Sequence, residues 1–151
     1  MGLKQISVFL ENSPGRLLEV TSALGEAGIN LRALSLADTP EKMGFGILRL
    51  LVSDLKGARK IAMERHWPAK VEEVLAVRIP DQPGSLARLL GPLYQNKISV
   101  DYMYAFTGFS SGEAVMIFHF KDMAPAKEVL SKSGAKLLGA KEFGLLESEE
   151  A

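Results

Sequence analysis

One short motif occurs twice in this chain, and a repeated unit constrains the fold more than any local pattern does. The residues Asn-Ser-Pro-Gly-Arg-Leu at 12–17 return as Asp-Gln-Pro-Gly-Ser-Leu at 81–86. The same register then aligns Leu24 with Leu93 and Ile29 with Ile98. Because the offset stays constant over these segments, the sequence predicts two copies of one supersecondary unit, each with a Pro-Gly turn before a helix.

The composition narrows the classes of protein to which this chain can belong. Its 151 residues include no cysteine, which excludes disulfides, thiolate metal sites and a cysteine nucleophile. The 18 basic residues balance the 18 acidic ones, so neither nucleic acid nor a membrane is expected as a partner. No apolar run is long enough to cross a bilayer, and residues 1–10 lack a signal-peptide core. We therefore expect a soluble, cytoplasmic protein.

Apolar periodicity divides the first copy into four strands and two helices. The expected strands are residues 5–10, 29–37, 47–52 and 70–74. Ser13 is the predicted N-cap of the first helix, with Pro14 at its first position and Gly28 at its end. Asp54 is the predicted N-cap of the second helix, which ends before the segment His66-Trp67-Pro68.

The second copy repeats this order of elements. Its expected strands are residues 75–79, 98–106, 114–120 and 135–143, and its expected helices are residues 83–95 and 125–132. Asp122 is the predicted N-cap of the last helix. No linker rich in Gly, Ser or Pro separates the copies, so residues 70–79 could form one nearly continuous extended segment.

The order βαββαβ in each copy is that of a ferredoxin-like unit. We expect an α+β protein with two such repeats in tandem, their antiparallel sheets side by side and the helices of each on one face. The predicted domains are residues 1–72 and residues 73–151.

Two segments of each copy resemble the ACT domain, the amino-acid-binding regulatory module of biosynthetic enzymes. In the first copy these are the strand–Pro-Gly–helix segment at 11–17 and Ala-Gly-Ile-Asn-Leu at 27–31. In the second copy they are residues 80–86 and 96–100. The resemblance covers nearly the whole chain and is closest to small stand-alone tandem ACT proteins, which carry no catalytic domain. It implies a regulatory protein that binds a free amino acid.

The resemblance also implies where the effector binds, because ACT domains bind it near the first strand–helix loop, often between two domains. Asn12 and Asn30 match the positions that hold the amino acid's polar groups in regulatory domains resembling that of phosphoglycerate dehydrogenase. The second copy departs from this pattern, since Asp81 replaces the first Asn and Ser99 the second. The candidate ligand-binding residues are Asn12, Ser13, Pro14, Gly15, Arg16, Leu17, Asn30, Asp81, Gln82, Pro83, Gly84, Ser85, Leu86 and Ser99.

These residue types suit a zwitterion for physical reasons. The amides of Gly15, Arg16 and Leu17 at a helix N-terminus can donate to a carboxylate. Asn12 or Asp81 can accept a hydrogen bond from an ammonium group. The sequence leaves a structural explanation equally open, because Asn and Asp also cap turns and a Pro-Gly pair need only form one.

Other candidates have the same two interpretations. Asn30 and Ser99 could be ordinary residues at the start of a strand. Tyr102, Tyr104 and Phe106 alternate along one strand and so share a face, where they could line a ligand's side-chain pocket or belong to a core or interface.

Two polar residues interrupt apolar strands. Arg49 and His119 alternate with Leu50 and Phe118, which predicts that both lie on the sheet face away from the helices. No Ser, Asp or Glu is evidently placed to work with His119.

The sequence contains no phosphate loop, nucleophile–base pair or metal-ligand cluster, so we expect neither an enzyme nor a cofactor or metal.

The leading hypothesis is a non-catalytic amino-acid sensor with its ligand at the strand–helix loops near the interface of the two repeats. Its expected partners are a free amino acid, a second copy of the chain, and a partner enzyme or regulator. The alternative is an ACT pair without ligand that acts as an oligomerisation scaffold. An RNA-binding ferredoxin-like domain is disfavoured by the neutral charge and the missing basic–aromatic motif.

Overall fold

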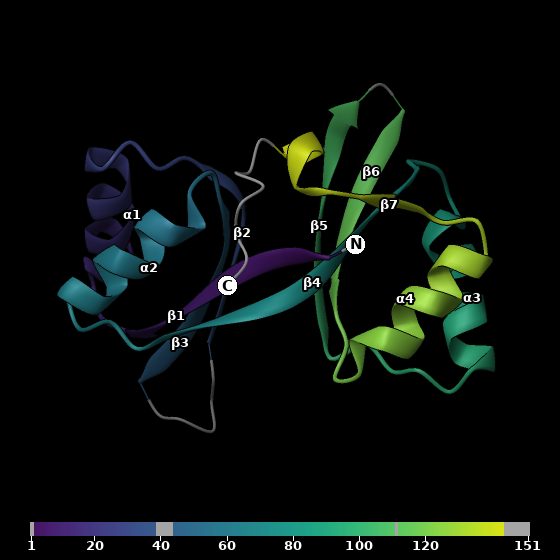
Figure 1. The fold of residues 1–151 in the computed structure, drawn as a ribbon, viewed down its shortest axis with the longest axis horizontal. Helices are drawn as coiled ribbons and strands as arrows, with labels where there is room; N and C mark the ends of the chain where they lie inside the picture. Colours follow the sequence, from purple (N-terminus) through teal and green to yellow (C-terminus); the bar gives the residue numbers. More distant parts are fainter. Residues whose placement is uncertain (1, 39–43, 111, 144–151) are drawn as a thin grey trace. The chain divides into compact units, whose positions relative to one another are not determined.

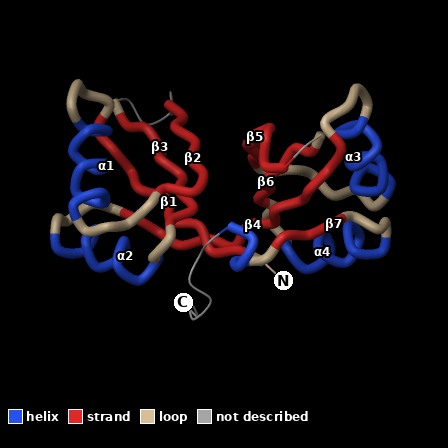
Figure 2. Tube along the Cα trace, turned by 90° about the horizontal axis from the view of Figure 1, so that it is seen from above, coloured by secondary structure: helices blue, strands red, loops and turns tan. Residues whose placement is uncertain are grey.

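A computed structural model describes residues 2–38, 44–110 and 112–143, and its course is drawn in Figure 1. The chain divides into two compact units. The N-terminal unit contains residues 4–72 and the described residues 140–143, and the C-terminal unit contains residues 2–3 and 73–139. In each unit both helices lie on the same face of the strands (Figure 2).

The N-terminal unit contains the predicted alternation of strands and helices. Its elements are β1 (Leu3–Glu11), α1 (Arg16–Glu26), β2 (Leu31–Asp38), β3 (Phe45–Val52), α2 (Leu55–Glu64) and the first residues of β4 (Ala69–Pro80). The strand order is β2-β3-β1-β4. Strand β3 runs antiparallel to both β1 and β2, so β1 and β2 point in the same direction.

The C-terminal unit repeats this arrangement with the rest of β4 as its first strand. It continues with α3 (Ser85–Gln95), β5 (Tyr102–Ser110), β6 (Glu113–His119), α4 (Met123–Lys132) and β7 (Lys136–Leu138). Strand β4 pairs antiparallel with β6 on one side and with β7 on the other, and β6 pairs with β5. The predicted ferredoxin-like order is therefore present twice.

Several predicted boundaries differ from the structure. The strands expected at 70–74 and 75–79 are one strand, β4, as the missing linker allowed. The strand expected at 98–106 begins only at Tyr102. The last helix begins at Met123, because a proline such as Pro125 is tolerated in a helix's first turn. The strand expected at 135–143 is wrong beyond Leu138, since the chain leaves β4 at Gly139 and forms a short 3₁₀ helix, η1 (Ala140–Phe143).

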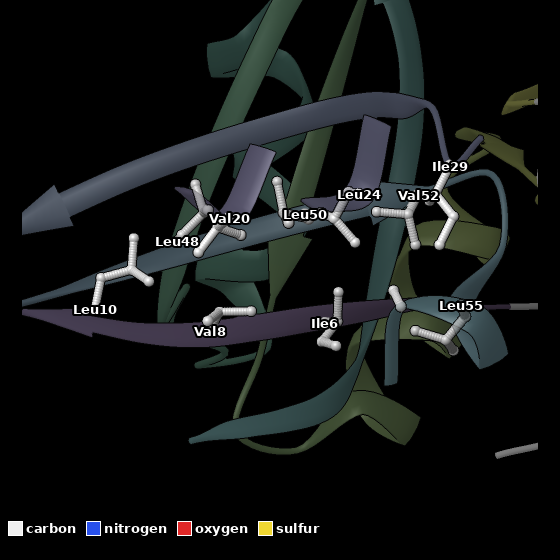
Figure 3. Close-up of a cluster of buried hydrophobic side chains, with 11 residues drawn as sticks. Ile6, Val8, Leu10, Val20, Leu24, Ile29, Leu48, Leu50, Val52 and Leu55 are labelled. Atoms are coloured by element: carbon white, nitrogen blue, oxygen red, sulfur yellow. The ribbon is translucent and has the colours of Figure 1, made fainter. Parts of the chain in front are cut away.

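The period-two pattern of the strands places alternate side chains under the helices. In the N-terminal unit, side chains of β1 and β3 point toward those of α1 (Figure 3). This core contains Ile6, Val8, Leu10, Val20, Leu24, Ile29, Leu48, Leu50, Val52, Leu55 and Ala58. The C-terminal core has the same plan and adds the aromatic pair Phe118 and Phe120.

No helix within the described ranges is long and apolar enough to cross a membrane.

The two predicted aspartate caps provide a matched pair for a stability measurement. Asp54 Oδ1 accepts from the Gly57 amide at 2.9 Å, whereas Asp122 is an N-cap residue without a side-chain capping bond. We expect Asp54→Ala to lower the free energy of unfolding by about 1 kcal/mol, and Asp122→Ala to lower it by less than half as much. Urea denaturation of both variants measures the difference. Equal losses would contradict this account of the two caps.

Candidate functional site

The Pro-Gly pair forms a tight turn before each unit's first helix. The Arg16 amide donates to the Ser13 carbonyl at 3.3 Å, and Gly15 has φ 90° and ψ −13°. These are the hydrogen bond and third-residue dihedrals of a type II turn, which favours Pro at its second position and Gly at its third. The prediction that Ser13 caps the helix is wrong, because the N-cap residue is Gly15 and no side chain caps it.

This turn changes which amides face outward at the start of α1. The Arg16 amide is used within the turn, and the Glu19 amide donates to the Gly15 carbonyl at 2.9 Å. The Leu17 amide belongs to the first-turn N–H groups that a helix leaves without an intrahelical acceptor. Of the three amides named from the sequence, that of Leu17 is thus the one best suited to an anion.

A cavity of about 240 Å³ lies beside the first Pro-Gly corner. The end of β1 with the following turn forms one wall, the start of α1 a second, and the end of β2 a third. Its lining residues are Leu10, Glu11, Asn12, Ser13, Arg16, Leu17, Leu36, Ala37, Asp38 and Gly46. The structure thus brings four predicted site residues, Asn12, Ser13, Arg16 and Leu17, together in one cavity.

The walls of this cavity carry both signs of charge. Arg16 lies between two carboxylates, with Nη1 at 3.0 Å from Glu19 Oε2 and Nη2 at 3.3 Å from Glu11 Oε2. The hydrogen bond to Glu19, and then the one to Glu11, raises the pKa of Arg16 above its ordinary value. The Glu11 and Asp38 carboxylates are acceptors on the walls. The cavity therefore offers acceptors for an ammonium group and donors for a carboxylate.

Asn30 does not lie with Asn12 inside the N-terminal unit. Strands β1 and β2 run in the same direction, and Asn12 follows the end of β1 whereas Asn30 precedes the start of β2. The two residues are therefore at opposite ends of the sheet. The Asn30 amide donates to Ser53 Oγ at 2.8 Å, and its carbonyl accepts from the Ser53 amide at 2.9 Å.

The second Pro-Gly corner has the same backbone but different surroundings. The Ser85 amide donates to the Gln82 carbonyl at 3.2 Å across Pro83, and Gly84 has φ 87°. A Cβ on Gly84 would lie 3.1 Å from Arg88 Nη1, whereas a Cβ on Gly15 would meet nothing within 4 Å. Arg88 also donates to Ser85 Oγ at 3.3 Å. The protein's own guanidinium thus lies against the second corner.

The other predicted residues of the second copy are dispersed. The Asp81 amide donates to the Gly112 carbonyl at 2.9 Å, and Leu86 packs against the C-terminal core. Ser99 lines a separate cavity of about 570 Å³, together with Asp101 and Lys121. The residues lining that cavity do not include Asp81.

Both interrupting polar residues lie on the sheet faces away from the helices, as predicted. Arg49 is opposite Ser7 in the pairing of β3 with β1, while its neighbour Leu50 is in the core. The expectation that His119 lacks a carboxylate is wrong, because Asp101 Oδ2 lies 2.9 Å from His119 Nδ1. The Tyr102 ring stacks on His119 with centroids 4.7 Å apart. Only the register between β5 and β6, which pairs Tyr102 with His119, could have indicated this cluster.

Among residues 2–38, 44–110 and 112–143, no cluster of three or more His, Cys, Asp or Glu side chains could hold a metal ion.

Comparison with known proteins identifies the family. The family model described as "ACT domain pair" matches residues 1–145. Protein BT0572 from Bacteroides thetaiotaomicron has a similar structure, with a TM-score of 0.87, 37% identity, and coverage of 97% of this chain and 98% of that one. The regulatory subunit of aspartate kinase from Thermus thermophilus gives 0.61 at 14% identity, covering 85% of this chain and 90% of that one.

The regulatory subunit of aspartate kinase from Thermus flavus is similar to the same degree. Its TM-score is 0.59 at 15% identity, with coverage of 85% of this chain and 88% of that one. At such identities the two kinase subunits show a shared fold and no more. The search of curated proteins found no match. With both Pro-Gly units inside the matched residues, the chain belongs to the family of ACT domain pairs.

Proposed function

We propose that this protein is a non-catalytic, cytoplasmic sensor that binds a free amino acid and regulates a partner protein. The observation that carries the proposal is the cavity beside the first Pro-Gly corner, where donors and acceptors for both ends of a zwitterion line one small space. The regulatory role is supported by the chain's membership of the family of ACT domain pairs, since the ACT domain is a regulatory module.

The ligand's two charged ends have distinct partners in this cavity. The carboxylate accepts from the Leu17 amide and from the Asn12 side chain, aided by the helix dipole. The ammonium donates to the carboxylates of Glu11 and Asp38. The side chain lies against Leu36. A volume of about 240 Å³ is below the usual range for drug-sized ligands, so a small amino acid is favoured.

A second copy of the chain would complete the site. Strand β2 ends the strand order of the N-terminal unit, and an edge strand can pair with another chain. If two β2 strands pair antiparallel about a two-fold axis, the start of one lies beside the end of the other. The partner subunit's Asn30 would then reach the cavity next to Asp38. This arrangement explains how both asparagines can hold one ligand although they lie apart in one unit.

Regulation then follows from linkage. An amino acid that binds only when the two copies are paired stabilises the paired state, and it can shift that equilibrium by no more than its differential affinity. A partner protein that binds only the paired state, or only the unpaired state, then responds to the amino-acid concentration. Each chain is proposed to have one such site, in its N-terminal unit, because Arg88 lies against the Pro-Gly corner of the C-terminal unit.

Two expectations from the sequence stay predictions. They are the domain boundary between residues 72 and 73 and a ligand position near the interface of the two repeats.

Calorimetry with a panel of free amino acids tests the proposal. We expect at least one small amino acid to bind more tightly than millimolar, and Asn12→Ala to weaken that binding about tenfold, because a hydrogen bond to a charged group is lost. Gln95→Ala, which also removes an exposed amide, is the control and leaves the affinity unchanged. A panel in which nothing binds, or an Asn12→Ala variant with full affinity, would refute the proposed site.

One observation favours the alternative of an oligomerisation scaffold without ligand. Arg88 covers the second corner with the protein's own side chain, which is what a unit that has lost its ligand would show. The alternative predicts dimers that form equally well without amino acids. It also predicts no change in melting temperature when amino acids are added, whereas a sensor is stabilised by its ligand.

A further inference from the structure

Another cavity of the N-terminal unit, of about 410 Å³, opens between α2 and the strands β1 and β4. It shares no lining residue with the cavity beside the Pro-Gly corner. Four of its lining residues are apolar and partly or fully buried: Ile6, Ala62, Trp67 and Val71. Three are basic: Lys4, Arg59 and Lys70. Its volume is in the range of small-molecule sites.

Among the described residues, carboxylates balance the positive charge of this cavity only in part. Lys70 Nζ lies 3.6 Å from Glu72 Oε2, which neutralises one cation in part. For Lys4 and Arg59, the described part of the chain supplies no ion-pair partner. Cations gathered around an apolar floor repel one another, and an anion that enters relieves this repulsion.

The other repeat shows what these positions do when the charge is balanced. The duplication aligns Lys4 with Glu73 and Arg59 with Lys127. In the C-terminal unit these residues form an ion pair, with Lys127 Nζ 3.4 Å from Glu73 Oε2. The N-terminal unit therefore has a lysine where its sister unit has the carboxylate that pairs with the helix cation.

Trp67 supplies a flat apolar surface at the same place. Its ring packs against the N-terminal core, and the Arg65 guanidinium lies 5.6 Å from the ring centroid. The sister repeat has Ala135 at the aligned position. The N-terminal unit thus has Lys where the C-terminal unit has Glu, and Trp where it has Ala. The lysine suits the acidic end of a ligand, and the tryptophan suits an apolar end.

We propose that this cavity binds a small organic anion with an apolar body. The acidic group lies between Lys4 and Arg59, which hold it by charge-assisted hydrogen bonds. The aromatic or aliphatic body rests on Trp67 and Ile6. This site is separate from the amino-acid cavity, so the protein has two small-molecule sites in its N-terminal unit.

Trp67 is the only tryptophan of the chain, so its fluorescence reports on this cavity. Anilinonaphthalene sulfonate, an aromatic anion, is the probe. We expect saturable quenching of Trp67 emission together with enhanced probe emission. Anilinonaphthalene without the sulfonate group is expected to bind at least about tenfold more weakly, because it lacks the charged hydrogen bonds. Absence of saturable quenching would overturn the proposal.

Lys4→Glu is the decisive variant, because it copies the Glu73–Lys127 arrangement and gives Arg59 an internal partner. We expect it to weaken probe binding at least about tenfold. Thermal unfolding is expected to be unchanged or to move to higher temperature, which separates lost binding from lost folding. Lys56→Glu, an equal charge change at an exposed position of α2, is the control and leaves probe affinity within about twofold.

Equal weakening by Lys4→Glu and Lys56→Glu would overturn the proposed site, since only the net charge would then matter. The amino-acid panel is repeated on Lys4→Glu with unchanged binding expected. Failure of the anion site therefore leaves the amino-acid site unaffected, and the two proposals fail separately.

Discussion

Phe118→Ala is expected to lower the free energy of unfolding by about 3–5 kcal/mol. Phe118 is 0% exposed in strand β6, and its ring stacks on Phe120 with centroids 5.6 Å apart. Removing the ring loses its burial and its stacking and leaves a cavity that the surrounding strands cannot close. Since a domain's whole stability is about 5–15 kcal/mol, this variant is expected to lie near the limit of folding.

Urea denaturation of Phe118→Ala, with Tyr94→Ala as the control, measures the loss of stability. Tyr94 is 83% exposed on α3 of the same unit, so its removal tests the loss of an aromatic ring without burial. We expect Tyr94→Ala to change stability by less than about 0.5 kcal/mol. If Phe118→Ala cost no more than Tyr94→Ala, the assignment of the C-terminal core would be wrong.

The fold could be predicted from the sequence because two independent signals agreed. Duplication of the Pro-Gly motif indicated two equal units, and the period-two and period-3.6 patterns indicated the elements within each. The predicted helix start was wrong where the backbone conformation of a single residue decides which residue is the N-cap. Ser13 has the right chemistry for an N-cap, but the left-handed conformation of Gly15 makes the glycine the capping residue.

The candidate site could be predicted only in part, because it depends on strand directions and on side chains distant in sequence. The motif at 12–17 indicated Asn12, Ser13, Arg16 and Leu17, which do line one cavity. Nothing local to the motif indicated that β2 supplies the third wall. The position of Arg88 over Gly84 depends on a side-chain rotamer that no sequence pattern specifies.

The cavity between α2, β1 and β4 could not be predicted from the duplication, because its signal is a difference between the repeats and the duplication shows what they share. Lys4 and Glu73 each look like an ordinary exposed residue of a strand. The alignment of the copies becomes informative once the structure pairs Glu73 with Lys127, since the lysine at position 4 then marks a missing carboxylate.

Leu34→Glu is expected to prevent the proposed dimer and, with it, most amino-acid binding. Leu34 lies on the edge strand β2 and is 53% exposed, although Leu50, its neighbour on β3, is buried. Pairing of two β2 strands would bury Leu34 in both copies, at about 1.5–3 kcal/mol for each fully buried side chain. The dimer dissociation constant is therefore expected to rise more than about 100-fold.

Analytical ultracentrifugation measures this constant, and calorimetry on the same samples measures amino-acid affinity. Leu34 does not line the cavity beside the Pro-Gly corner, so the substitution leaves that cavity's own walls intact. Affinity is nevertheless expected to fall about tenfold, because the partner subunit's Asn30 no longer reaches the ligand. Tyr94→Glu introduces the same charge at an exposed position of α3 and is expected to change neither quantity. A Leu34→Glu monomer with full affinity would show that one chain suffices for binding, and the shared site would then have to be abandoned.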